Sequence, residues 1–155
     1  TDVPGPHYQG DVRDIIDQGW DLMVAHPPCT YLAISGARWW KDRQQEQQEA
    51  LDFVQLLMDA PIAQIAIENP VSCISSRIRK PSQYIQPWMF GDGETKKTCL
   101  WLTGLPLLKP TNVVSGRSPA VHHMPPSKDR WKLRSLTYKG IADAMGSQWS
   151  TYPLK

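Results

Sequence analysis

The sequence has few cysteines and no long apolar run, and both absences exclude whole classes of protein. Cys29, Cys73 and Cys99 are an odd number with no Cys-x-x-Cys spacing, which argues against a zinc site and a disulfide framework. No run approaches the roughly 18 apolar residues of a membrane-spanning helix. Because no basic-then-apolar leader opens the sequence, we expect reduced thiols, no membrane partner and a cytoplasmic protein.

Internal repeats and low-complexity tracts are also missing. A length of 155 residues is enough for one domain with a substantial core. His122 and His123 are adjacent but have no further ligands at suitable spacing, so we expect no metal site.

The charge is small in total but unevenly distributed. The net charge is +2, yet residues 77–139 contain twelve of the seventeen Lys and Arg and only three acids. A basic segment of this kind is typical of a surface that binds a polyanion such as DNA. The alternative is an ordinary solvated loop rich in lysine. Tryptophans and tyrosines lie within the same segment, and nucleic-acid bases stack on such rings.

The first half of the chain predicts alternating helices and strands. We expect a short helix from Asp11 to Gly19, a buried strand over Leu22–Ala25, an amphipathic helix from about Trp40 to Asp59, and a second strand over Ile62–Ile67. A strand, a helix and a strand of these lengths form a βαβ unit. The pattern therefore predicts an α/β fold with a parallel sheet covered by helices.

The second half is interrupted by prolines. They recur at 81, 87, 106, 110, 125 and 126, so no long helix fits between them. One strand is expected over Thr98–Thr103, followed by an irregular, basic and exposed segment from Gly104 to Arg130. A final helix is expected over Lys139–Trp149.

Two reactive side chains follow the two predicted strands of the βαβ unit. Cys29 comes after Pro27-Pro28, and Glu68-Asn69-Pro70 ends the second strand. Ligands bind beyond the carboxyl ends of parallel strands, so a thiol and a carboxyl at this edge predict a nucleophile and a proton donor in one cleft. Taken singly, Cys29 could be a buried apolar thiol and Glu68 a surface carboxylate.

Four motifs together resemble the cytosine-5 DNA methyltransferase family. Residues 28–36, Pro-Cys-Thr-Tyr-Leu-Ala-Ile-Ser-Gly, resemble its nucleophile motif, and residues 68–70 resemble its Glu-Asn-Val signature. Gly10-Asp11-Val12 is similar to a cofactor motif, and residues 134–137, Arg-Ser-Leu-Thr, are similar to its Arg-x-Leu-Thr motif. Small phage proteins of this family share the strings Ala-His-Pro-Pro-Cys-Thr-Tyr-Leu and Ile-Ala-Ile-Glu-Asn-Pro.

The resemblance implies a Rossmann-like, S-adenosylmethionine-dependent methyltransferase fold that is incomplete at its N-terminus. Residues 1–103 would form the core without its first strand, residues 104–133 a small recognition segment, and residues 134–155 a C-terminal helix packing back on the core. The implied enzyme is a DNA (cytosine-5-)-methyltransferase encoded by a phage or prophage and acting in the bacterial cytoplasm.

The implied chemistry begins with addition of the Cys29 thiolate to C6 of a cytosine flipped out of the DNA. Glu68 would protonate N3, and C5 would then accept the methyl group of S-adenosylmethionine. Lys96 and Thr98 stand where the family has an arginine pair, although Lys96 could also be an exposed lysine of a basic stretch. The implied cofactor contacts are Asp2, Asp11, Val12 and Pro28. The implied DNA and base contacts are Pro27, Ser35, Gly36, Arg38, Asn69, Pro70, Thr98 and Arg134.

The sequence departs from the family at two motifs. The glycine-rich first motif and the last, Asn-bearing motif are not found. Three interpretations follow: a truncated chain, a second chain or N-terminal segment that completes the cofactor pocket, or a decayed enzyme that keeps its nucleic-acid surface.

Other classes of function remain alternatives. One is a DNA-binding or decoy protein without catalysis, and another is a C5-modifying enzyme that acts on free pyrimidine nucleotides. A thiol hydrolase built on His26 and Cys29 is disfavoured, because two prolines separate these residues.

Overall fold

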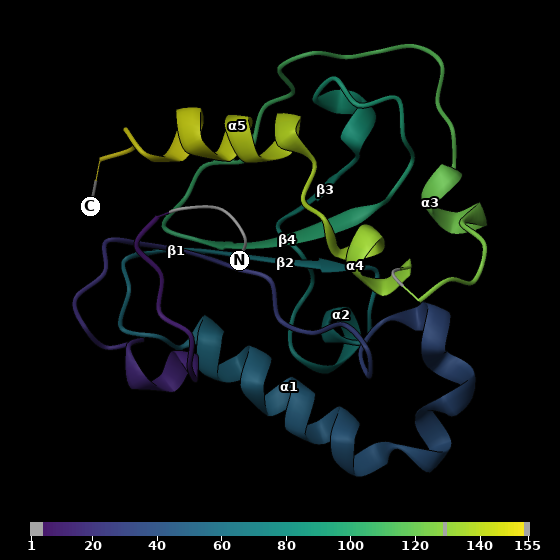
Figure 1. Ribbon diagram of the computed structural model, residues 1–155. Coiled ribbons are helices and arrows are strands. Elements are labelled where there is room, and N and C mark those ends of the chain that lie inside the picture. Colours follow the sequence, from purple (N-terminus) through teal and green to yellow (C-terminus); the bar gives the residue numbers. More distant parts are fainter. Residues whose placement is uncertain (1–4, 129, 154–155) are drawn as a thin grey trace.

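A four-stranded mixed sheet lies at the centre of the computed structural model, which describes residues 5–128 and 130–153 (Figure 1). Its strands are β1 (Leu22–Ala25), β2 (Gln64–Pro70), β3 (Gln83–Ile85) and β4 (Thr98–Thr103), in the spatial order β1-β2-β4-β3. β1 and β2 are parallel, whereas β4 is antiparallel to both β2 and β3. The protein therefore has a mixed α/β fold.

The βαβ unit is confirmed, but the prediction of a wholly parallel sheet is wrong. The bounds of β1 and β4 are those predicted. A parallel connection needs a crossover of a dozen or more residues, usually a helix, whereas the chain after β2 carries only the one-turn helix α2 (Ile74–Arg77) before it returns through β3 and β4. β2 also extends to Pro70, because Glu68 and Pro70 pair with Leu100 and Thr98 of β4.

Helix α1 (Gln44–Met58) covers one face of the sheet (Figure 1). Its buried residues Leu51, Val54 and Leu57 recur at helical spacing and pack in one cluster with Ile65, Ile67 and Trp101 of the sheet. The predicted helix from Trp40 is interrupted, since Arg43 has a non-helical backbone (φ −133°, ψ 37°). The preceding residues form the 3₁₀ segment η2 (Ile34–Asp42).

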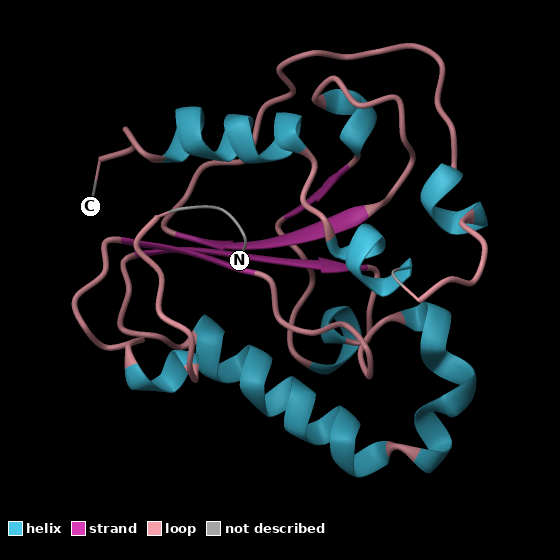
Figure 2. Cartoon of the chain, viewed as in Figure 1, coloured by secondary structure: helices cyan, strands magenta, loops and turns pink. Residues whose placement is uncertain are grey.

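Helix α5 (Lys139–Trp149) covers the opposite face and has the predicted bounds (Figure 2). Ile141, Ala144, Met145 and Trp149 of this helix are buried in a second cluster with strand residues such as Leu100. The sheet is thus buried between two helical layers, and the side chains of each strand alternate between them.

The segment after β4 is irregular, as predicted, but it is not exposed throughout. Leu108 is buried, and its backbone N–H and carbonyl form hydrogen bonds of 2.8 and 2.7 Å with the side-chain amide of Gln83 in β3. The segment also contains one short helix, α3 (Ala120–His123), and α4 (Arg130–Ser135) leads from it toward α5. A further 3₁₀ turn, η3 (Pro87–Met89), follows β3.

The predicted N-terminal helix is only one 3₁₀ turn, η1 (Val12–Asp14). The Asp11 side chain accepts a hydrogen bond from the backbone N–H of Arg13 and so caps this turn. Among the described residues, no helix combines the length and the apolar character needed to cross a bilayer.

Candidate active site at the carboxyl ends of β1 and β2

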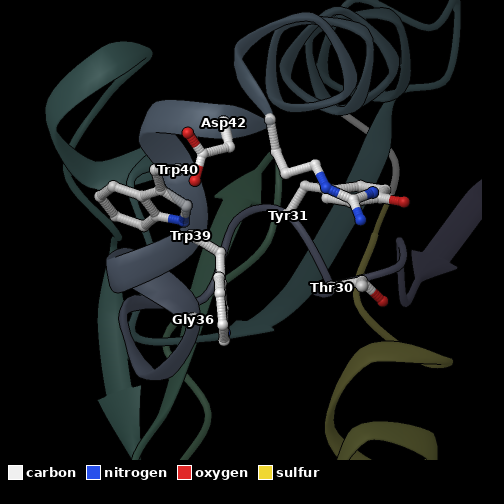
Figure 3. Close-up of a pocket in the computed structure, with 7 residues that line it drawn as sticks. Thr30, Tyr31, Gly36, Trp39, Trp40 and Asp42 are labelled. Atoms are coloured by element: carbon white, nitrogen blue, oxygen red, sulfur yellow. The ribbon is translucent and has the colours of Figure 1, made fainter.

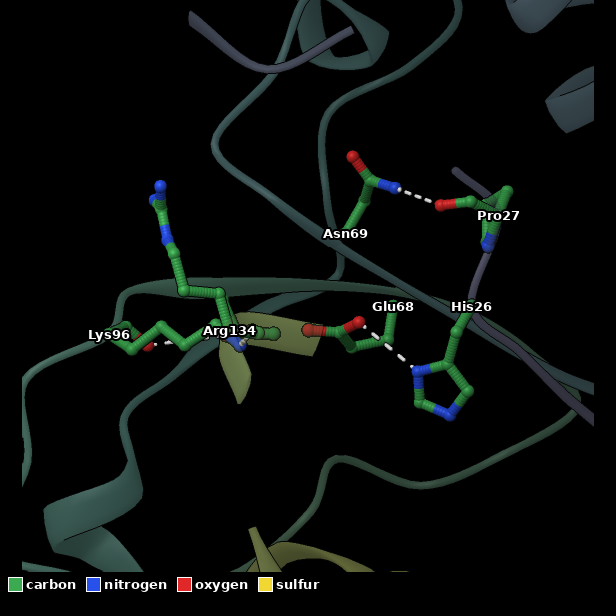
Figure 4. Close-up of polar contacts among 7 residues, drawn as sticks. His26, Pro27, Glu68, Asn69, Lys96 and Arg134 are labelled. Carbon is green, nitrogen blue, oxygen red and sulfur yellow. Dashed lines mark hydrogen bonds and ion pairs between the residues drawn. The ribbon is translucent and has the colours of Figure 1, made fainter. Parts of the chain in front are cut away.

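His26 and Glu68 meet where β1 and β2 end. Ala25 pairs with Ile67, so the next residue of each strand lies opposite the other and on the same face of the sheet. His26 Nδ1 lies 3.1 Å from Glu68 Oε2, a distance at which one proton joins the two groups (Figure 4). Residue types alone did not suggest His26 as the partner of Glu68. The pairing follows from the alternation of side chains between the two faces of the sheet on both strands.

Glu68 opens into a cavity of about 30 Å³ on the α5 side of the sheet. The cavity is lined by His26, Glu68, Lys96, Thr98, Ser135, Leu136, Thr137, Tyr138, Ile141 and Met145. This volume holds about one or two water molecules and is far below the roughly 300–1,000 Å³ of ligand pockets. The structure therefore shows the carboxyl in a closed state, with the chain between α4 and α5 as its cover.

Lys96 and Thr98 face this cavity together with Glu68, which agrees with their expected place two residues apart. Lys96 Nζ donates a 2.9 Å hydrogen bond to the carbonyl oxygen of Arg134 and lies 5.6 Å from the centre of the Tyr138 ring. Thr98 is buried, and its hydroxyl donates to the carbonyl of Lys96 at 3.2 Å. Thr98 is thus a packing residue in this state, whereas Lys96 ties the sheet to the cover.

Arg134, an expected DNA contact, contributes its backbone and not its guanidinium to this site. Figure 4 shows its side chain pointing away from Glu68, while its carbonyl accepts the bond from Lys96. The neighbouring Tyr138 hydroxyl donates to Glu94 Oε2 at 2.8 Å. Burial, together with this bond, raises the pKa of Tyr138, so its hydroxyl stays protonated and keeps the cover in place.

Cys29 lies in an exposed turn and does not line the Glu68 cavity. Its carbonyl accepts from the backbone N–H groups of Leu32 and Ala33, at 3.1 and 2.9 Å, which folds the chain into a tight turn after Pro28. The buried Asn69 side chain donates a 2.9 Å hydrogen bond to the Pro27 carbonyl (Figure 4). This bond joins the end of β2 directly to the residues that carry the thiol.

Further hydrogen bonds hold the turn on its other side. The buried Gln47 of α1 donates from its amide to the Tyr31 carbonyl at 3.0 Å. Backbone bonds from Cys73 to Leu32 and from Ile34 to Val71 continue the attachment. The thiol therefore lies on a turn that is tied at both ends to the sheet and α1. Gln47 was not expected to take part, because a glutamine inside a predicted helix gives no such signal.

The other two thiols differ from Cys29 in their surroundings. Cys73 and Cys99 are buried. Burial raises the pKa of both, to about 11 for Cys99, so these thiols are protonated and shielded at neutral pH. The exposed Cys29 is thus the one cysteine of the chain that a reagent or substrate can reach.

A second and larger hollow follows the Cys29 turn. This cleft has a volume of about 420 Å³ and is lined by Thr30, Tyr31, Gly36, Trp39, Trp40, Asp42 and Arg43 (Figure 3). Gly36 comes from the expected DNA-contacting set. The other two members on η2, Ser35 and Arg38, are exposed, and the Arg38 guanidinium lies 5.0 Å from the centre of the Trp39 ring.

The expected cofactor residues do not form a pocket for S-adenosylmethionine among the described residues. Both carboxylate oxygens of Asp11 bind Arg13, which also lowers the pKa of Asp11. Val12 packs against the α1-side core, and Pro28 is exposed. Asp2 lies outside the described residues. Because Asp11 already caps η1 and pairs with Arg13, the residues present do not fit S-adenosylmethionine.

Pro70, an expected base contact, closes β2 as the partner of Thr98 in the ladder. Among the described residues, no three His, Cys, Asp or Glu side chains gather as metal ligands would.

Comparison of the chain with known protein families, with curated proteins and with solved structures finds no match.

Proposed function

We propose that this chain adds the Cys29 thiolate to C6 of a cytosine in DNA, the nucleophilic step of cytosine-5 methylation. The observation that carries the proposal is the Asn69–Pro27 hydrogen bond of 2.9 Å, which holds the Cys29 turn against the strand that contains Glu68. A nucleophile and a proton donor on neighbouring parallel strands are the arrangement that this chemistry needs. The four motifs that resemble cytosine-5 DNA methyltransferases support the same assignment.

The proposed reaction balances with the groups of the chain and water. Cys29 Sγ forms a bond to C6 while N3 takes the proton that Glu68 holds, so the ring gains an enamine whose C5 is nucleophilic. C5 then accepts an electrophile and loses its original proton to water, the C6–S bond breaks, and N3 returns its proton to the Glu68 carboxylate, which restores the ring. The imidazole of His26, hydrogen-bonded to Glu68, can carry this proton between the carboxyl and water.

Base entry requires the cover of the Glu68 cavity to open. Residues 135–138 line the cavity of about 30 Å³, and the bond from Lys96 to the Arg134 carbonyl fastens the cover to the sheet. When a base displaces this cover, Lys96 is released next to Glu68. Its ammonium can then bind the phosphate of the flipped nucleotide as a point charge. Binding energy from the DNA thus opens the site.

The residues present do not fit S-adenosylmethionine, because both Asp11 carboxylate oxygens bind Arg13, so no methyl-transfer step is assigned to this chain. The chain's own contribution is the base-binding and nucleophilic half. This half can be tested without a methyl donor.

The test is exchange of the C5 hydrogen of cytosine with water. Reversible addition of Cys29 lets C5 take up a solvent proton and lose its own. DNA that carries tritium at cytosine C5 should therefore release tritium to water when the protein is added. Cys29→Ala should abolish the release, whereas Cys73→Ala, which removes a buried thiol, should retain it in the folded protein. Release that survives Cys29→Ala, or no release from DNA that the protein binds, contradicts the proposal.

One observation favours a second candidate, a DNA-binding protein that does not turn over. Cys29 does not line the Glu68 cavity, and the cavity is too small for a base as it stands. This candidate rests on the basic segment of residues 77–139. It predicts salt-dependent DNA binding that Cys29→Ala leaves unchanged, without exchange at C5.

A further inference from the structure

The cleft beside the Cys29 turn is lined by aromatic side chains, which are suited to binding a flat ring. Three of its seven lining residues, Tyr31, Trp39 and Trp40, are aromatic, and Figure 3 shows the two tryptophans on one side of the view and Tyr31 on the other. The volume of about 420 Å³ falls within the range of ligand pockets. An apolar cleft with several aromatic walls favours stacking over hydrogen-bond recognition.

The Trp39 side chain lines the cleft and is 58% exposed, so its ring is accessible to a ligand. It does not contribute to either core cluster, so the stability of the fold does not explain its position. Nearby Trp40 is partly buried and packs against the core on the α1 side, and its buried indole N–H has no hydrogen-bond partner among the described residues. The exposed ring of Trp39 is the one suited to stacking with a base.

One cation and one acid, Arg43 and Asp42, line the same cleft, and two further cations lie on η2. Arg38 stacks on Trp39, Lys41 is exposed on η2, and Arg43 lines the cleft while it pairs with Glu46 at 3.2 Å. Arg38 and Lys41 have no acidic partner among the ion pairs that the structure shows, so both can meet phosphates. Aromatic rings interleaved with Lys and Arg are the features that bind single-stranded nucleic acid.

We infer that this cleft binds the nucleobase next to the target cytosine in an unstacked strand, with Trp39 as the main stacking surface. The cleft begins at Thr30, the residue after Cys29, so a strand whose cytosine reaches the thiol passes directly over it. The inference rests on the proposed function, which supplies the substrate. The chain would recognise the neighbouring base by stacking. Stacking tolerates any base and favours purines, because their rings are larger.

The test measures binding of a fluorescent single-stranded oligodeoxynucleotide that contains one cytosine. Trp39→Ala should weaken binding about fivefold to a hundredfold, the usual effect of losing one stacked base, and Trp39→Phe should restore most of it. Because stacking releases no counterions, Trp39→Ala should leave the salt dependence unchanged, whereas Arg38→Ala should reduce its slope by about one. Trp20→Ala is the matched control, since Trp20 is 50% exposed and lies outside the cleft.

A second set of oligonucleotides locates the contact. An abasic site beside the cytosine should weaken binding to the native protein and remove the difference between Trp39→Ala and the native protein. Equal binding of the two proteins to the intact strand, or a difference that persists with an abasic site on either side, overturns the inference. Binding is read in Cys29→Ala as well. If binding depends on Trp39 but the protein does not exchange the C5 hydrogen, the proposed chemistry is wrong and the inference about the cleft stands.

Discussion

His26 Nδ1 lies 3.1 Å from Glu68 Oε2, and this contact joins the residue that follows β1 to a side chain of β2 on the same face of the sheet. The Glu68 side chain is 22% exposed and that of His26 is 43% exposed, so the pair sits at the mouth of the closed cavity. This contact places the imidazole within reach of the carboxyl, so in the proposed reaction it can relay the proton that Glu68 delivers.

We therefore expect His26→Ala to lower the rate of C5 exchange about tenfold, the lower end of the effect of a hydrogen bond to a charged group. When the rate is measured at a single fixed pH, His26→Asn should retain most of it, because the asparagine amide can still donate a hydrogen bond to Glu68. The amide cannot relay a proton, however. The pH dependence of exchange should then differ between His26→Asn and the native protein. If the two profiles coincide, His26 only positions the carboxyl.

Gln47 provides the second prediction, on the attachment of the Cys29 turn. Gln47→Leu removes the 3.0 Å bond to the Tyr31 carbonyl and leaves that acceptor unpaired, at a cost of about 1–3 kcal/mol in the free energy of unfolding. The freed turn should also change the rate at which a thiol reagent labels Cys29. Gln48→Leu is a close control on the exposed side of α1, where the amide bonds only to Asp52. If the two variants have the same stability and labelling rate, the Gln47 attachment has no role.

The sequence predicted the elements that have sharp boundaries. The bounds of β1 and α5 were correct, because His26-Pro27-Pro28 ends the strand and an apolar face of helical period defines the helix. β3 was missed, since three residues give no periodic signal. The direction of β4 was also not predicted, because its pattern of side chains is the same in either orientation, and tertiary pairing alone decides it.

The candidate site was predicted in part for similar physical reasons. Cys29 and Glu68 follow from the strand ends, but the hydrogen-bond partners His26, Asn69 and Gln47 depend on how separate elements dock. Lys96 lines the same cavity as Glu68, and its bond to the Arg134 carbonyl depends on the path of the chain between α4 and α5. An irregular segment has no periodic pattern of apolar residues, so its path cannot be predicted from the sequence.

Cys99 gives a prediction on stability at high pH. Burial raises the pKa of its thiol from about 9 to about 11, so the folded state keeps a proton that the unfolded chain loses first. The resulting stabilisation is fully present below pH 9 and is lost as the pH rises through 11. The stability difference between the native protein and Cys99→Ala should shrink over this range by at most about 2–3 kcal/mol.

Urea unfolding at several pH values between 8 and 11 measures this difference directly. Tyr138, whose pKa burial also raises, titrates in both proteins and cancels in the comparison. Cys99→Val, which fills the site with an apolar side chain, should show the same loss of pH dependence as Cys99→Ala. A difference that stays constant from pH 8 to pH 11 would show that the Cys99 thiol is not shielded by the sheet.

The two glycines of α5 provide a matched pair that tests how this helix sits on the sheet. A Cβ at Gly140 would overlap the carbonyl oxygen of Phe90, whereas a Cβ at Gly146 meets no other group within 4 Å. Gly140→Ala should therefore destabilise the protein by about 1–3 kcal/mol, because the backbone of a packed segment must shift. Gly146→Ala should stabilise it by up to about 1 kcal/mol through helix propensity alone.

Thermal unfolding distinguishes the two substitutions, since 1 kcal/mol corresponds to roughly 2–4 °C in a domain of this size. The same shift of α5 would reach the candidate site, because Ile141 and Met145 of this helix line the Glu68 cavity. Gly140→Ala should thus also change the rate of C5 exchange, while Gly146→Ala leaves it unaltered. If alanine at 140 stabilises the protein as it does at 146, α5 cannot lie against Phe90, and the closed form of the Glu68 cavity loses its support.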